Sequence, residues 1–215
     1  MLKKPKPLMS NIRFAKLVIV VNGLVPLALL LWDVYHKNVG ANPQEFAIRT
    51  TGMMTLIFLT TTIAITPVRK VFGVNSVVKL RRMVGLFAFF YGVLHLTTYI
   101  WFDRWFNFRS VVGDVARRPF ILFGMLAFLL MVPLAITSTN KMVKRLGGKA
   151  WGRLHRIVYL AAIAGVAHFW MLVKSDTRLP LTFAFIVGLL LAHRVFVKYA
   201  PVAPPSASTS LFPRN

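Results

Sequence analysis

VGLFAFFYGVLHLTTYIWF, residues 84 to 102, is a continuous apolar run in which His95 is the only basic side chain. A helix that crosses a membrane needs about 20 mainly apolar residues, and this run has that length and composition. A polar ring at membrane depth is costly, so a histidine inside such a run indicates a functional site. The run therefore predicts a membrane helix that carries part of that site.

Five further runs of similar length extend this pattern along the chain, of which 57% is hydrophobic. They predict an all-α integral membrane protein, a bundle of six transmembrane helices. Threonines dilute the second run, although their hydroxyls can bond back to their own helix, and Pro67 is expected to end it. The six predicted spans are Phe14 to Trp32, Ile48 to Thr66, Val84 to Phe102, Phe120 to Ser138, Leu154 to Val173 and Leu179 to Val197.

The distribution of charge predicts which side of the membrane each loop faces. With a cytoplasmic N-terminus, nineteen of the 27 Lys and Arg residues fall in inner segments, and all five acidic residues fall on the outer side. This excess of positive charge inside predicts that both termini are cytoplasmic. Basic loops beside anionic membrane lipids account for the net charge of +22, so no nucleic-acid partner is expected. We expect a multi-pass protein of the bacterial inner membrane.

Three segments are expected along the chain. Residues 1–13 form a cytoplasmic N-terminal segment, residues 14–198 the six-helix transmembrane domain, and residues 199–215 a disordered cytoplasmic tail rich in Pro, Ser and Ala. The first apolar run is too long for a signal peptide and is expected to be a retained span. The chain has no cysteine, which excludes disulfides, Cys-ligated iron–sulfur clusters and covalent haem attachment.

Two histidines within the predicted spans form the main candidate site. His95 and His168 lie on the third and fifth spans, which run in the same direction, so both reach a similar depth near the outer side. Neutral imidazoles at this depth favour axial ligation of one haem iron held between the two helices. A hydrogen bond to a neighbouring helix, or a proton or ion path, is the alternative for each histidine. Gly92 and Gly165 precede them by one turn and provide either room for a macrocycle or close helix packing.

A second, inner site is suggested by a matched spacing. His155 stands thirteen residues before His168, and Arg82 stands thirteen residues before His95. Because a guanidinium is a poor iron ligand, Arg82 or Arg81 is expected to pair with a haem propionate, or to act only as a positive-inside anchor. Thirteen α-helical steps leave His155 and His168 roughly 140° apart, so the helix must bend or the two sites must use different faces.

The other two histidines carry weaker signals. His36 lies in the first outer loop and is expected to be an exposed polar residue, and His193 lies near the inner end of the last span, where an interfacial position explains it. The outer loop after the third span is rich in aromatic residues. These residues favour an interfacial aromatic belt, with a docking surface for a partner as the alternative.

Several motifs together resemble the MsrQ (YedZ) family of haem-binding membrane subunits within the ferric-reductase-like transmembrane group. The resemblance covers about residues 10 to 198. It rests on RRMVGL from Arg81, LHLT from Leu94, GANP from Gly40, ITP from Ile65, RP at Arg118, TST from Thr137, WGRLH from Trp151, and Tyr159.

That resemblance implies a six-helix b-type cytochrome with His95, His155 and His168 at the haem-binding positions, and FMN as a further cofactor. It implies electron transfer from the quinone pool or a flavin reductase to a periplasmic molybdopterin enzyme, MsrP, which reduces methionine sulfoxide in oxidised periplasmic proteins. Arg82 stands where a fourth histidine ligand is expected, so one haem b is assigned and a second is left open. The chain shows no catalytic constellation of its own. The alternatives are the haem-containing anchor of another quinone-linked oxidoreductase and a histidine-relay transporter.

Overall fold

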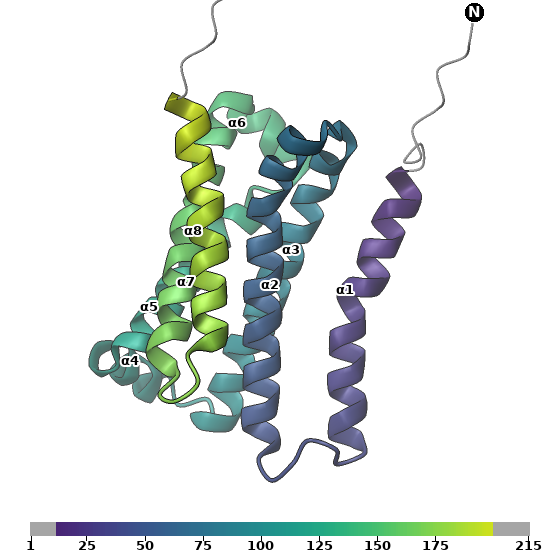
Figure 1. The fold of residues 1–215 in the computed structure, drawn as a ribbon. Coiled ribbons are helices and arrows are strands. Elements are labelled where there is room, and N and C mark those ends of the chain that lie inside the picture. Colours follow the sequence, from purple (N-terminus) through teal and green to yellow (C-terminus); the bar gives the residue numbers. More distant parts are fainter. Residues whose placement is uncertain (1–11, 200–215) are drawn as a thin grey trace, which may run out of the picture.

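The computed structural model describes residues 12 to 199, and within them every regular element is a helix (Figure 1). Short 3₁₀ or π segments interrupt or extend several of the α-helices, among them η1 (Asn75–Val77), η2 (Tyr99–Asp103) and η3 (His155–Ile157). The α-helices are α1 (Ile12–Tyr35), α2 (Pro43–Phe72), α3 (Val78–Thr98), α4 (Phe108–Arg117), α5 (Pro119–Ile136), α6 (Asn140–Leu154), α7 (Val158–Leu172) and α8 (Arg178–Tyr199).

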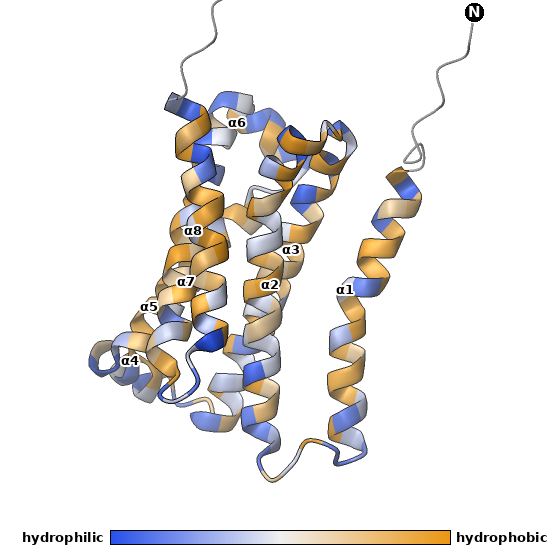
Figure 2. Ribbon diagram, in the orientation of Figure 1, coloured by the Kyte–Doolittle hydropathy of each residue, from blue (hydrophilic) through white to orange (hydrophobic). Residues whose placement is uncertain are grey.

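Six helical segments of the described chain are long and apolar enough to cross a membrane, which confirms the predicted spans. Apolar residues cover the long helices and polar residues gather at their ends (Figure 2). Large apolar side chains such as Phe14 on α1 and Phe185 on α8 are well exposed, as expected where the surrounding solvent is lipid. The chain is therefore a multi-pass membrane protein.

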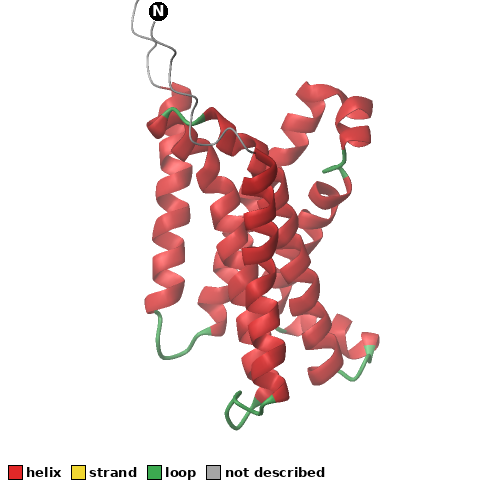
Figure 3. Ribbon diagram, turned by 90° about the vertical axis from the view of Figure 1, so that its right-hand side faces the viewer, coloured by secondary structure: helices red, strands yellow, loops and turns green. Residues whose placement is uncertain are grey.

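The two ends of the bundle differ in what lies across them. The start of α1, the end of α8 and the basic helix α6 lie at one end, and the short helix α4 lies at the other (Figure 1). A view turned by 90° shows the same long helices, with the described loops near their ends (Figure 3). The expected N-terminal segment 1–13 and the tail 199–215 lie almost entirely outside the described residues.

Helix α2 is longer than the sequence predicted, because it does not end at Pro67. It continues to Phe72 and ends at Gly73, whose left-handed backbone (φ 68°) few other residues adopt without strain. Within a membrane bundle, neighbouring groups can satisfy the carbonyl that a helical proline leaves free. The threonine hydroxyls do bond back to their own helix, as from Thr55 to Thr51 O at 2.9 Å.

Tyr91 of α3 hydrogen-bonds to the backbone of α1. The hydroxyl of the fully buried Tyr91 donates to Gly23 O at 2.7 Å and accepts from Leu27 N at 3.2 Å, so it is inserted into the hydrogen-bond ladder of α1. This insertion lies beside Pro26, which cannot donate to the ladder. The contact fixes α3 against α1 one turn before His95. The main core lies elsewhere in the bundle, in a cluster that includes Ile63, Ala88, Met131, Ala161 and Val187.

Candidate haem-iron site

The structure brings the side chains of His95 on α3 and His168 on α7 next to each other. Their ring centroids lie 6.1 Å apart and the ring planes are inclined by 77°. A metal ion held between two imidazole nitrogens, at about 2 Å from each, separates the ring centroids by about 6 Å. The structure thus brings these two side chains together at a separation that suits one shared metal ion, and their role as iron ligands stays a prediction.

Each ring is oriented by a backbone carbonyl of a neighbouring helix. His95 Nδ1 lies 2.9 Å from Ile48 O of α2, and His168 Nδ1 lies 2.6 Å from Phe120 O of α5. A carbonyl oxygen can only accept, so in both rings Nδ1 must carry the proton. The lone pair of each neutral imidazole is then on Nε2. A carbonyl that fixes the tautomer and the ring angle in this way is typical of metal-bound histidines.

A glycine one turn beyond each carbonyl makes room for the imidazole. A Cβ atom at Gly52 would lie 2.9 Å from His95 Cε1, and one at Gly124 would lie 2.8 Å from His168 Nδ1. These distances are shorter than an ordinary van der Waals contact, so the rings occupy space that only glycine leaves free. The pairs α2–α3 and α5–α7 thus repeat one arrangement of carbonyl, glycine and histidine, and the carbonyl precedes the histidine by 47 and 48 residues.

The two glycines that the sequence singled out have the other role considered for them. A Cβ atom at Gly92 would lie 3.1 Å from Met131 Cε, and one at Gly165 would lie 3.5 Å from Leu56 Cδ1. Side chains of neighbouring helices therefore cover both positions, which are sites of close helix packing. The glycines that contact the histidine rings are instead on α2 and α5, and the sequence reasoning missed them.

The composition of this site fits a haem better than a closed metal site. Among residues 12 to 199, no group of three or more His, Asp or Glu side chains is arranged to hold a metal ion. A protein-only zinc site needs three or four such ligands, whereas a haem supplies four nitrogens and needs only two axial ligands. The Thr60 hydroxyl lies two turns along α2 from Gly52 and is buried without a hydrogen-bond partner in the described structure. Buried hydroxyls are usually hydrogen-bonded, so this oxygen is free to contact a bound group.

His155 lies apart from this pair, in the 3₁₀ turn η3 between α6 and α7. Its ring stacks on Trp151 with centroids 3.9 Å apart, and its Nε2 lies 3.1 Å from Thr137 Oγ1. The Thr137 hydroxyl donates to Pro133 O at 2.6 Å, so Nε2 of His155 is the donor to that oxygen. The imidazole is thus engaged differently from those of His95 and His168. The chain also changes helix type at His155, which breaks the uniform rotation that the sequence argument used.

The structure assigns polar partners to both candidate arginines. Arg82 donates to Asn140 Oδ1 at 2.6 Å from an exposed position, and the half-buried Arg81 donates to Thr66 Oγ1 at 3.4 Å. Both lie on the first turn and a half of α3, at the same end of the bundle as α6. Their expected pairing with haem propionates stays a prediction.

The remaining histidines lie away from the pair. His36 is exposed just after α1, as the sequence predicted, and its Nδ1 lies 3.0 Å from Trp32 O. His193 is half-buried near the end of α8. Neither is placed with His95 and His168.

Comparison with known proteins identifies the relatives of this chain. Residues 47–166 match the family model described as "Ferric reductase like transmembrane component". A protein-methionine-sulfoxide reductase heme-binding subunit MsrQ of Herminiimonas arsenicoxydans is 47% identical over 194 residues, which cover 89% of this chain and 88% of the relative. The proteins of the same name from Rhodospirillum rubrum and Caulobacter vibrioides are 47% and 41% identical, over 85% and 90% of this chain and 88% and 91% of the relatives.

Proposed function

This chain belongs to the MsrQ family within the ferric-reductase-like transmembrane proteins of the bacterial inner membrane, and on that basis we propose that it is a b-type cytochrome subunit. In this role it carries electrons across the membrane to a periplasmic molybdopterin methionine sulfoxide reductase, MsrP. The electrons enter from the quinone pool or from a flavin reductase, with FMN as a further cofactor by family resemblance. The product of the pathway is repaired methionine in oxidised periplasmic proteins.

The observation that carries this proposal is the matched pair of imidazoles. His95 and His168 each donate from Nδ1 to a carbonyl of a neighbouring helix and so present an Nε2 lone pair, with the two rings 6.1 Å apart. Haem bound between them supplies a one-electron redox couple inside the membrane. The chain itself holds the ligand rings at fixed angles through the two carbonyl hydrogen bonds.

The charge distribution supports the proposed direction of electron transfer. The basic helix α6 lies at the same end of the bundle as the start of α1, and we assign this end to the cytoplasm. Basic side chains there, such as Lys149 and Arg153, suit an anionic electron donor or haem propionates. His95 and His168 are nearer the opposite end, where electrons leave toward the periplasmic partner. Both termini are then cytoplasmic.

A second, inner haem is proposed at His155, with Arg81 or Arg82 pairing with a propionate. Ligation through Nε2 requires His155 to release the Thr137 hydroxyl, to which it is hydrogen-bonded. We therefore expect the inner site to bind haem more weakly than the site at His95 and His168.

A reduced-minus-oxidised absorption spectrum of detergent-purified protein tests the proposal. We expect b-type haem bands in the wild type, their loss from the outer site in His95→Ala and His168→Ala, and partial retention in His155→Ala. His36→Ala is the control, because His36 is exposed and lies outside the site. A wild-type spectrum without haem bands would refute the proposed function, and unchanged haem content in all three variants would refute the ligand assignment.

A further inference from the structure

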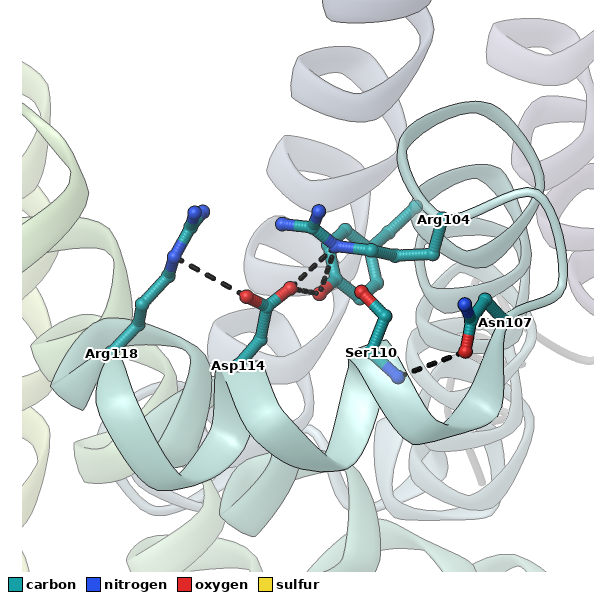
Figure 4. A network of polar contacts seen from close by, with 6 residues as sticks. Arg104, Asn107, Ser110, Asp114 and Arg118 are labelled. Carbon is teal, nitrogen blue, oxygen red and sulfur yellow. Dashed lines mark hydrogen bonds and ion pairs between the residues drawn. The ribbon is translucent and has the colours of Figure 1, made fainter.

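Asp114 is the centre of a polar network on α4, at the end of the bundle opposite α6 (Figure 4). Its Oδ2 accepts from the Tyr99 hydroxyl and pairs with Arg104 Nε, both at 2.5 Å, and its Oδ1 lies 3.3 Å from Arg118 Nε. Both carboxylate oxygens are thus engaged, and the Asp114 side chain is only 12% exposed. Arg104 Nε also donates to the Tyr99 hydroxyl at 3.2 Å, and this hydrogen bond raises the pKa of the Arg104 guanidinium, which stays charged.

Through Tyr99, the network is connected to the helix that carries His95. Tyr99 follows His95 by one turn, and its backbone N–H donates to the His95 carbonyl. Tyr99 also begins the π-helical turn η2, and such turns are frequent at functional sites. A hydrogen bond from the Tyr99 side chain to Asp114 therefore fixes the end of the helix that carries His95.

Through Arg118, the network is connected to the carbonyl that orients His168. The Arg118 N–H donates to Asp114 O at 2.8 Å, in addition to the ion pair between their side chains. Arg118 is the N-cap of α5, and its carbonyl accepts from the amides of Ile121 and Leu122. Two residues after Arg118, the Phe120 carbonyl holds His168 Nδ1. Asp114 thus links the helix that carries one imidazole to the carbonyl that orients the other.

The local backbone supports a positioning role. Trp105 and Phe106, between η2 and α4, have left-handed backbones with φ of 47° and 58°, which aromatic residues rarely adopt. Such strain persists only where the surroundings over-determine the conformation, and it concentrates at functional sites. The mostly buried ion pair between Asp114 and Arg104 is expected to add little to the stability of the fold, because the cost of desolvating both charges offsets their attraction.

We propose that Asp114 is a positioning residue that sets the separation and relative angle of the His95 and His168 imidazoles. This inference rests on the proposed role of the two histidines as haem ligands. Tyr99, Arg104 and Arg118 act through it as the three contacts of one clamp. Without the carboxylate, α4 no longer ties η2 to the start of α5, so the two rings lose their fixed relation.

The test compares Asp114→Asn with Asp176→Asn in the full chain. Asp176 is a matched control, because its pair with Arg178 is 4.0 Å long and the two side chains are 70% and 93% exposed. The measurements are the low-spin g values of the oxidised haem by electron paramagnetic resonance and the rate of haem transfer to apomyoglobin. We expect Asp114→Asn to shift or broaden the low-spin signal and to raise the transfer rate several-fold, and Asp176→Asn to match the wild type.

Two further variants keep the test decisive. Asp114→Glu restores the charge and should recover part of the wild-type signal. Tyr99→Phe removes the hydroxyl that contacts Asp114 and Arg104 but leaves both ion pairs of Asp114 in place, so it should produce a smaller shift in the same direction. If Asp114→Asn does not fold, Tyr99→Phe and Arg118→Gln decide the question. A folded Asp114→Asn protein with wild-type g values and transfer rate would overturn the inference while leaving the proposed function intact. A wild type without haem would overturn both.

Discussion

Adding one methyl group at Gly52 or Gly124 should displace the imidazole that lies against it. In Gly52→Ala the new Cβ atom would lie 2.9 Å from His95 Cε1, and in Gly124→Ala it would lie 2.8 Å from His168 Nδ1. Carbon atoms prefer separations of about 3.5–4.0 Å, so each ring must move by roughly 0.5–1 Å. The ring cannot make this movement and also keep its short hydrogen bond to Ile48 O or Phe120 O.

The expected magnitude follows from the cost of overpacking. Extra methyl groups in a well-packed interior cost about 1–3 kcal/mol. If this free-energy cost falls entirely on the haem-bound state, it weakens haem binding by about 5- to 150-fold. Replacing a helical glycine with alanine also favours the helix itself by about 1 kcal/mol, so a loss of haem cannot be attributed to a weaker helix.

The assay is the haem content of purified protein by the pyridine haemochrome method, together with the rate of haem transfer to apomyoglobin. Gly165→Ala and Gly188→Ala are matched controls, because a Cβ atom would lie 3.5 Å from Leu56 Cδ1 at the first and has no neighbour within 4 Å at the second. We expect both controls to retain wild-type haem. If Gly52→Ala and Gly124→Ala retained it equally well, the assignment of these glycines to the histidine site would be wrong.

Other predictions concern the bundle, its orientation and its partner. Tyr91→Phe leaves Gly23 O and Leu27 N without the inserted hydroxyl, so we expect a loss of about 1–3 kcal/mol in stability, measured as a lower thermal midpoint with haem retained; an unchanged midpoint would contradict the role of this contact. Because the chain has no cysteine, Arg145→Cys and Arg109→Cys provide single labelling sites. A membrane-impermeant maleimide should label intact spheroplasts only at position 109, and the reverse result would invert the topology. Deleting the periplasmic reductase should abolish methionine sulfoxide repair and leave haem reduction intact; loss of reduction would refute the direction of transfer.

The six spans were predictable because membrane insertion depends on local composition. An apolar run of sufficient length spans the bilayer whatever its neighbours are, so each predicted span falls on one of the six long helical segments, although several of these extend further. Pro67 shows where this local reasoning fails. Proline usually ends a helix in water, but inside a bundle neighbouring groups can satisfy the freed carbonyl, and α2 continues to Phe72.

Part of the candidate site was also predictable from the sequence, and part was not. His95 and His168 were predictable as a facing pair, because charge counting places their helices parallel and depth then follows from position along each helix. The roles of the glycines were not predictable. Gly92 and Gly52 are both helical glycines near the depth of His95, and only the rotation of each helix decides that Gly52 contacts the ring and Gly92 contacts Met131.

The sequence by itself determined the number of spans, which stretch of the chain forms each of them, and which two histidines share a depth. These properties depend on the composition of each segment and on the rise per residue along a single helix. Both are known without knowing which helices pack beside it. Only the tertiary structure decided which atoms surround the rings: the carbonyls of Ile48 and Phe120, the bare backbones of Gly52 and Gly124, and the clamp at Asp114. The physical reason is that these contacts join separate helices, so they depend on rotation and packing angle, which no single segment encodes.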